Sequence, residues 1–555
     1  MSNLKTKLAW DQIDWTKVQQ RIFRIQRRIY RAKTKQNITV VYYLQNKLIN
    51  SLDAKLLAVN QAICLKNREN TKKIQLNDDL TGQKKWQLAN SLKLNEKSSH
   101  SCQRPITMSS KQKPTIVLLK DLAKQNLVKM ALEPEWEAVF ENSVYGFRPG
   151  RHYYDAIEQI FINIQSEPKY VINAKIEDLT QLNCDLLLKK LNTISNIKNQ
   201  LKIWLNANIF TDDSKETFEY EKSIFKGGIL TPLLLNIAFH GLETHLNQWY
   251  SNLNHLNKDH PQSAKQISFI RYGENFVIIT PEQVTEEAKF VVEKWFLNIG
   301  LNKIKTHICC TTTGFNFLGF HIILINKNHK YRCRIHISRE SKKELLIKTR
   351  LIIQNNKASS SYILIKKLTP ILLQWATYFQ YSQCLKDFQK IDQAIFGQLR
   401  AWVFRRKAPG MNRHALKEKY FPSGNIYKFK GKTFKNNWIL CGQSKTLNGK
   451  IIKNYLPKLS WISRQKFLKI KENASIFNSD HIYWTLKLKN YSHFKPRLSH
   501  LIRLQKGQCA LCQKTFSPID QMKIICFDSL SHSNQSSCVH SQVVHKNCLL
   551  SKASF

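Results

Sequence analysis

The chain has 555 residues, enough for about three to four domains at ~150 residues each. It carries 87 Lys and Arg against 39 Asp and Glu, a formal net charge of +48. Hydrophobic residues make up 42%, which excludes a wholly disordered chain, and no apolar run reaches the ~18 residues of a membrane span. A membrane-surface anchor would be shorter and less evenly basic, so the charge predicts nucleic acid as the partner and no membrane.

Thirteen cysteines, mostly isolated, argue against a secreted disulfide framework. Few glycines and abundant Lys, Asn and Ile suggest an AT-rich coding genome. With no clear transit peptide at the N-terminus, we expect synthesis inside an organelle. A plastid is the first expectation, a mitochondrion the second and bacterial cytoplasm the third.

The N-terminal segment, 1–62, is predicted to be helical and to bind RNA. From Trp10 to Ala32 apolar residues recur at helical spacing. Several Lys and Arg residues stand among them, and no acidic residue lies between Lys17 and Lys35. A solvated surface helix is the alternative, but such a charge run favours contact with phosphates. The expected RNA-binding residues are Arg21, Arg24, Arg27, Arg28 and Arg31. A second helix is expected from Tyr42 to Ala62.

The rest of the chain divides by composition and pattern. Residues 63–117 read as a loop-rich connection. In 118–325 helical patterns alternate with β-rich runs at Tyr170–Ile176, Ile267–Ile279 and Phe315–Ile323, which predicts an α+β domain. Residues 342–460 are helical and then rich in short strands and turns, 461–506 read as a linker, and 507–555 form a small Cys/His-containing tail.

Six motifs follow one another along the chain: ALEPEWEA at 131–138, SVYGFRPGR at 143–151, KGGILTPLLLNI at 226–237, HGLE at 240–243, RYGENFV at 271–277 and FLGF at 317–320. In this order and spacing they resemble group II intron-encoded reverse transcriptase/maturases. The resemblance implies a right-hand polymerase architecture with fingers and palm, followed by a helical thumb that is the maturase-specific X domain.

The resemblance places the X domain within residues 342–460 and implies that this domain has a surface that clamps RNA. Arg405, Arg406 and Lys407 are expected to contact phosphates. The neighbouring rings of Trp375, Tyr378 and Trp402 would either stack on unpaired bases or belong to the core. For Trp375 and Tyr378 we favour the core.

The polymerase motifs differ from the family pattern at the positions of the metal-binding carboxylates. The family holds two Mg²⁺ ions with one Asp in an Asp-Ala-Asp-Ile strand and two in Tyr-Ala-Asp-Asp. Here Lys175, Glu274 and Asn275 stand at those positions, so one of three carboxylates remains, and a protonated Lys cannot bind a metal. Glu177 or Asp178 would replace the first Asp only if the strand slipped in register. The polymerase is expected to be inactive. Mg²⁺ is expected as a cofactor only if the polymerase proves to be active.

The tail carries two pairs of potential metal ligands, Cys509 with Cys512 and His545 with Cys548. Their spacing predicts a structural Zn²⁺ site of the Cys₃His type. Reduced cysteines without a metal are the alternative, and His532, Cys538 or His540 are possible substitute ligands. The tail resembles the HNH endonuclease domain of many group II intron proteins, which implies contact with DNA. Ile525 and Cys526 replace its Asp-His pair and Leu549 replaces a later His, so no nuclease activity is expected.

These features together predict a splicing maturase that binds the precursor RNA containing a group II intron and needs no carboxylates of its own. The rival is a working intron-mobility protein with RNA-directed DNA polymerase and DNA endonuclease activity, against which Lys175, Asn275 and Cys526 argue. A decaying reading frame without function is the third alternative, and the intact ligand pairs of the tail argue weakly against it.

Overall fold

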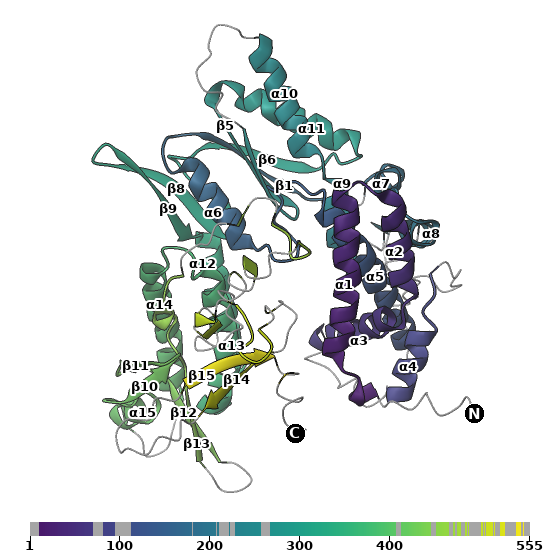
Figure 1. Ribbon diagram of the computed structural model, residues 1–555. Coiled ribbons are helices and arrows are strands. Elements are labelled where there is room, and N and C mark those ends of the chain that lie inside the picture. The colour runs from purple at the N-terminus through teal and green to yellow at the C-terminus, as the bar shows by residue number, and fades with distance from the viewer. Residues whose placement is uncertain are drawn as a thin grey trace, which may run out of the picture.

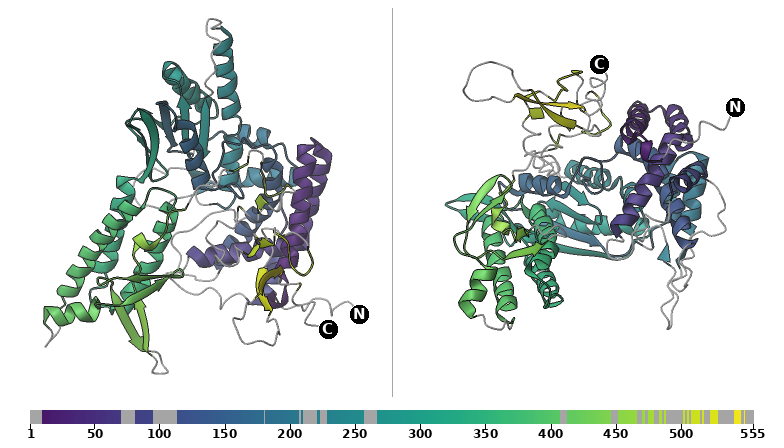
Figure 2. Two further views of the ribbon diagram at one scale, coloured as in Figure 1. Left: turned by 60° about the vertical axis from the view of Figure 1, so that its left-hand side comes forward. Right: turned by 90° about the horizontal axis from the view of Figure 1, so that it is seen from below.

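The computed structural model describes residues 10–69, 81–94, 113–179, 181–206, 208–209, 221–222, 228–256, 267–406, 412–445 and 451–465, and shorter stretches between 470 and 548. In Figure 1 the N-terminal helices and the thumb lie on opposite sides of a central sheet, and Figure 2 shows the same arrangement from two further directions. No helix within these ranges is both long enough and apolar enough to cross a membrane.

The N-terminal helices form a bundle around α5 (Lys113–Glu137), preceded by the short 3-10 helix η1 (Trp10–Gln12). The other members are α1 (Trp15–Thr34), α2 (Ile38–Asn50), α3 (Leu52–Glu69) and α4 (Gly82–Asn90). The prediction of one helix from Tyr42 to Ala62 is wrong, because Ser51 is extended and separates α2 from α3. The Ser51 hydroxyl accepts the N–H of Ala54 and so caps the start of α3.

The palm is a four-stranded antiparallel sheet in the order β4-β5-β1-β6. Its strands are β1 (Tyr170–Ile176), β4 (Ser268–Tyr272), β5 (Asn275–Thr280) and β6 (Ile304–Cys310). In β1, Ile172 and Ala174 join the core shared with the N-terminal bundle, whereas Val171 joins the core shared with the thumb. The sheet therefore separates two hydrophobic cores. Because successive side chains point to opposite faces of the sheet, β1 contributes residues to both cores.

Helices and short strands surround the palm. They are α6 (Tyr153–Ile164), α7 (Cys184–Leu191), α8 (Ser195–Asn206), α9 (Thr231–Ala238), α10 (Leu242–Leu256), η3 (Glu282–Val284), α11 (Thr285–Asn298), β2 (Asn208–Ile209) and β3 (Glu221–Lys222). A second sheet, β7-β8-β9, leads into the thumb through β7 (Phe315–Phe317), β8 (Phe320–Lys327) and β9 (Lys330–Ile337).

The thumb is built from four helices and two hairpins. The helices are α12 (Arg339–Gln354), α13 (Ser361–Phe379), α14 (Leu385–Phe404) and α15 (Arg413–Tyr420). The hairpins are β10 (Ile426–Phe429) with β11 (Lys432–Lys435) and β12 (Cys441–Lys445) with β13 (Ile451–Tyr455), followed by η4 (Leu459–Trp461). In the tail, β14 (Met522–Phe527) pairs with β15 (His540–His545).

The stretch expected to be a linker, 461–506, packs against the body where the structure describes it. Phe477 lies against Phe23 of α1, with ring centroids 5.7 Å apart, and Trp484 is buried. The ammonium of Lys487 lies 2.8 Å from Asp155 at the start of α6, and both side chains are buried. A Cβ at Gly150 would lie 2.5 Å from the Trp484 ring, so this contact requires glycine. The stretch thus connects α1 to the loop before α6.

Candidate functional sites

The three polymerase positions meet at one end of the palm sheet. Gly273 and Glu274 form the two-residue turn of the β4–β5 hairpin, and Gly273 has the positive φ of +63° that such turns require. Lys175 lies directly opposite Asn275 in the pairing of β1 with β5, and its side chain is exposed. The backbone carbonyl of Glu274 accepts the N–H of Ile176 at 3.1 Å. Lys175, Glu274 and Asn275 are therefore adjacent, as the resemblance implies.

The strand register leaves no room for the slip that would bring Glu177 or Asp178 into the site. Pairing of β1 with β5 is continuous from Tyr170 to Lys175. Glu177 and Asp178 follow the strand and form ion pairs with Lys305 and Lys303, each at 3.2 Å. A two-metal site needs several carboxylate oxygens around both ions. With a lysine and an amide at two of the three positions, the residues present do not fit such a site.

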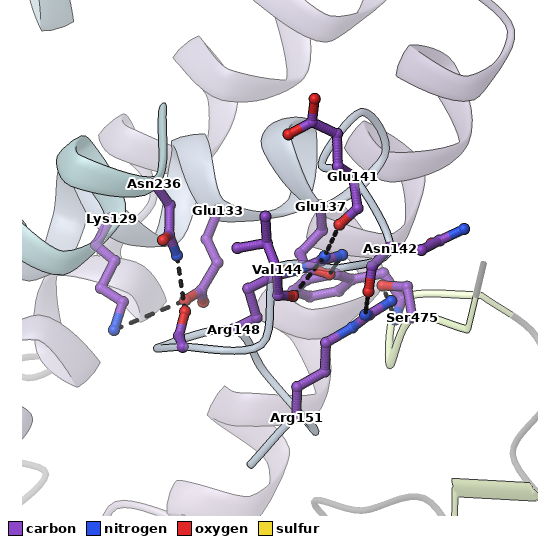
Figure 3. Close-up of polar contacts among 12 residues, drawn as sticks. Lys129, Glu133, Glu137, Glu141, Asn142, Val144, Arg148, Arg151, Asn236 and Ser475 are labelled. Carbon is purple, nitrogen blue, oxygen red and sulfur yellow. Dashed lines mark hydrogen bonds and ion pairs between the residues drawn. The ribbon is translucent and has the colours of Figure 1, made fainter. Parts of the chain in front are cut away.

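The 143–151 motif folds into a loop that pairs with β4, because Tyr145 donates to the carbonyl of Arg271 and Arg271 donates to that of Ser143. Its two arginines are buried, and Figure 3 shows their polar contacts. The Arg148 guanidinium pairs with Glu137 at 2.8 Å, with both side chains at most 2% exposed. It also donates to the backbone carbonyls of Glu141 and Val144. Arg151 donates to the carbonyl of Asn142 at 2.5 Å, and burial lowers its pKa to about 10. These cations stabilise the loop and are not available to RNA.

The loop is fastened to the hairpin by close backbone contact. A Cβ at Gly146 would lie 2.2 Å from the backbone nitrogen of Gly273, so no other residue fits there. Arg271 of β4 is fully buried, donates to the carbonyl of Gly273 at 3.2 Å and stacks over Phe239. Burial lowers the pKa of Arg271 to about 9. The retained motifs at 143–151 and 271–277 therefore hold each other in place, whatever chemistry the hairpin carries.

A half-buried polar group beside this loop was not predicted from the sequence. Burial raises the pKa of Glu243 to about 7, although the Ser143 hydroxyl donates a hydrogen bond to its carboxylate. Burial also lowers the pKa of Lys190 to about 8, and its ammonium donates to the carbonyls of Ala238 and His240. The HGLE motif at 240–243 is the sequence signal for this group, because it places a histidine and an acid on an otherwise apolar segment.

On α1 the predicted RNA-binding arginines divide into two sets. Arg24, Arg28 and Arg31 are exposed. Arg21 forms two hydrogen bonds with Asp53 of α3, at 2.5 and 2.7 Å. Arg27 is half-buried, and burial together with nearby Arg31 lowers its pKa. The first set presents the charge that a phosphate backbone would meet.

The cations at the end of α14 also differ from one another. Arg405 is exposed. The neighbouring Arg406 stacks 3.7 Å over the ring of buried Trp402 and donates to the carbonyls of Lys357 and Ser359, so it ties α14 to the loop after α12. Lys407 lies outside the described residues.

The aromatic residues of the thumb contribute to packing. Tyr378 stacks on Tyr153 with centroids 4.0 Å apart, and Trp375 packs against Phe379 and Phe388. The indole of Trp402 donates to the carbonyl of Asn356 at 3.1 Å. Trp402 is buried, and Trp375 and Tyr378 are half-buried and pack against the core, as favoured for these two residues.

The four predicted tail ligands come together, with one donor atom each from Cys509, Cys512, His545 and Cys548 all within 4.8 Å. His545 ends β15, and its Nδ1 lies 3.3 Å from the Cys512 sulfur. Burial and the neighbouring Cys512 thiol raise the pKa of Cys548 to about 12. Crowded thiols with one imidazole suit a soft tetrahedral cation. The backbone of Cys526 pairs with Ser541 in the adjoining hairpin, and Leu549 lies outside the described residues.

Comparison with known families finds three matches along the chain. Residues 10–92 match the N-terminal domain of reverse transcriptase, and 97–322 match reverse transcriptase (RNA-dependent DNA polymerase). Residues 342–421 match the group II intron, maturase-specific domain. The last match covers α12 to α15 and so assigns the thumb helices to the maturase-specific domain.

The chain is also similar in sequence to individual proteins. Maturase-like protein 1 of Euglena gracilis is 23% identical over 69% of this chain and 79% of its own length. Its namesake from Euglena longa is 24% identical over 68% of this chain and 79% of its own. Protein YkfC of Escherichia coli is 26% identical over 39% of this chain, and the match spans 64% of that protein. The chain belongs to the group II intron reverse transcriptase/maturase family.

Proposed function

We propose that this protein is a splicing maturase that binds a group II intron-containing precursor RNA and holds the intron in its catalytic fold, without polymerase or endonuclease activity. The observation that carries the proposal is the Lys175–Asn275 pairing in an intact palm, beside a maturase-specific domain. The scaffold of a polymerase is maintained while its metal ligands are absent from two of three positions.

The physical task of a maturase agrees with these features. The intron RNA performs the splicing chemistry, so the protein has to offset phosphate repulsion and position RNA domains. A net charge of +48 and the exposed arginines of α1 supply the electrostatic attraction. The buried arginines of the 143–151 loop stabilise the scaffold that carries these surfaces.

A primer-extension assay with purified protein tests the loss of polymerase activity. We expect no Mg²⁺-dependent cDNA synthesis from the natural sequence. The double change Lys175→Asp with Asn275→Asp restores the three carboxylates and should give measurable extension, whereas either change alone should not. Efficient extension by the natural protein, abolished by Glu274→Ala, would instead establish the rival function, an active intron-mobility protein.

We further propose that the tail binds one structural Zn²⁺ through Cys509, Cys512, His545 and Cys548 and that it contacts DNA or RNA without cutting it. The tail is short, so the metal should supply most of its folding energy. Metal analysis of the full-length protein should give about one equivalent of zinc. Cys509→Ser should lose the zinc and expose the tail to protease, whereas Cys64→Ser, which changes an exposed thiol on α3, should alter neither.

A plastid remains the proposed compartment, with a mitochondrion second and bacterial cytoplasm third. The Lys-, Asn- and Ile-rich composition supports an organellar genome, and two of the relatives come from species of Euglena. Fractionation of the source cells, followed by detection of the protein with an antibody, would distinguish the compartments.

A further inference from the structure

A groove between α12 and α14 of the thumb is not explained by the packing of the domain. It consists of two adjoining hollows of about 420 and 430 Å³, which share Arg350 and Gln398 in their walls. The two helices pack side by side (Figure 1), so the groove lies along the line where they meet. We call this feature the α12–α14 groove.

The rim of the α12–α14 groove is cationic. No acidic residue lines either hollow within the part of the thumb that the structure describes. Exposed cations on α12 and just beyond the ends of both helices surround it, namely Arg339, Lys343, Arg350, Lys357 and Arg405. Lys342 also lines it, but its ammonium is held by Asp387 at 3.0 Å. The charge of the rim therefore favours an anionic ligand.

The floor of the larger hollow is apolar and is kept open by a glycine. Ile353 and Trp402 are buried beneath it. Gly397 lies in the interior of α14, where glycine costs about 1 kcal/mol relative to alanine. A Cβ at this position would meet nothing within 4 Å, so no close packing requires the glycine. Its effect is to leave space above the helix.

We propose that the α12–α14 groove binds a single unpaired nucleotide of the RNA, with the base over Gly397 and the flanking phosphates on Arg350 and Arg405. A hollow of about 420 Å³ lies in the ~300–1,000 Å³ range of small-ligand pockets, so it suits one flipped-out base. Proteins recognise RNA mainly at such unpaired nucleotides, through an apolar surface for the base and cations for the backbone.

The polar groups of the groove support this assignment. The Gln398 amide is already fixed, because it accepts the Thr349 hydroxyl and donates to the carbonyl of Leu346. Gln354 is exposed at the end of α12 and lines the larger hollow. Its amide can donate to and accept from the edge of a base, which offers selectivity among bases. The proposal deepens the proposed function, since it names how the thumb holds the intron RNA.

The test uses the full-length protein with a single-stranded RNA octamer and a duplex of the same length as probes. Gly397→Leu should fill the hollow and weaken octamer binding about 10-fold, within the range known for base–protein contacts, while duplex binding stays unchanged. Gly397→Ala is the matched control, because its Cβ has open space, and it should bind like the natural protein. Arg350→Gln should weaken the binding of both probes, since it removes a phosphate contact.

Several results would overturn the groove proposal. They are equal octamer affinity for Gly397→Leu and Gly397→Ala, an equal loss of duplex binding, or displacement of the octamer by poly-glutamate as readily as by unlabelled octamer. The last result would assign the groove to an acidic protein. Both Gly397 variants should melt at or above the temperature of the natural protein, which shows that the fold is intact. If the octamer binds as proposed while intron RNA binds no better than a control RNA of equal length, the proposed function fails and the groove stands.

Discussion

The 143–151 loop of the palm and the α12–α14 groove of the thumb are both rich in cations, but they use them in opposite ways. In the loop, Arg148 is buried and pairs with a carboxylate and two backbone carbonyls. In the groove, Arg350 and Arg405 are exposed around a hollow that no acid lines among the described residues. Arg148 therefore stabilises the loop, whereas Arg350 and Arg405 remain available to a partner.

The contrast also holds between neighbours in sequence. Arg405 and Arg406 are identical in type and adjacent, but only Arg406 is bound to backbone carbonyls and stacked on Trp402. A run of cations in a sequence therefore predicts a basic segment without showing which members remain free. The difference depends on which carbonyl groups and rings the tertiary fold brings within reach.

The largest expected effect separates buried from exposed arginines. Arg148→Ala leaves Glu137 as a buried, unpaired charge, which costs about 3–5 kcal/mol of stability. Arg24→Ala removes an exposed side chain of α1 and should change stability by less than about 0.5 kcal/mol. Thermal melting and limited proteolysis of the two variants provide the comparison. Equal melting temperatures would mean that the loop does not depend on Arg148.

The second prediction concerns the exposed set on α1. Replacing Arg24, Arg28 and Arg31 with Ala should reduce the slope of log K against log salt by about two to three units, at ~0.7–0.9 for each phosphate contact. Binding of precursor RNA, measured across a series of salt concentrations, gives this slope. Arg21→Ala serves as the control. It should reduce the slope less than a single replacement of Arg24, Arg28 or Arg31, because Asp53 holds the Arg21 guanidinium. An unchanged slope in the triple variant would show that α1 does not face the RNA.

The smallest expected effect is a pH dependence from the half-buried group beside the loop. Folding raises the pKa of Glu243 from its ordinary 4.5 to about 7, because the carboxylate is partly withdrawn from water. Between these values the folded state retains a proton that the unfolded chain releases, so Glu243 makes stability fall as pH rises through this window. Glu243→Gln removes that penalty while its amide oxygen can still accept from Ser143.

Melting temperatures of this variant and the natural protein, compared at about pH 5 and about pH 8, check the prediction. The advantage of Glu243→Gln should be larger at the higher pH. Glu286→Gln, an exposed position in the first turn of α11, is the control and should show no such trend. The same advantage at both values would mean that Glu243 is ionised throughout.

Much of the palm was predictable from sequence because its signals are local. The β-rich run Tyr170–Ile176 is β1 from end to end. The β-rich run Ile267–Ile279 covers the β4–β5 hairpin except for its last residue, with Gly273 at the turn. The four metal-ligand candidates of the tail were likewise predictable from their spacing, since each pair lies close in sequence.

Two kinds of feature were not predictable. The break between α2 and α3 is local, but it falls at Ser51, a residue that helices also tolerate, so the apolar periodicity does not mark it. The other features depend on distant residues. The contacts of Phe477 with α1 and of Lys487 with Asp155 join residues far apart in the sequence, which a polar stretch does not reveal. The α12–α14 groove arises from a glycine on one helix and cations on two, and becomes visible only when the helices pack.

We propose that the protein assists splicing through RNA binding and without polymerase chemistry in the palm. This is tested most directly by the splicing rate of a precursor RNA containing the host intron, at a Mg²⁺ concentration where the RNA alone splices slowly. We expect the natural protein and its Glu274→Ala variant to accelerate splicing equally, and the triple Arg24, Arg28 and Arg31 variant to do so far less. No acceleration by the natural protein, or loss of acceleration in Glu274→Ala alone, would show that the protein does not act as a maturase of this kind.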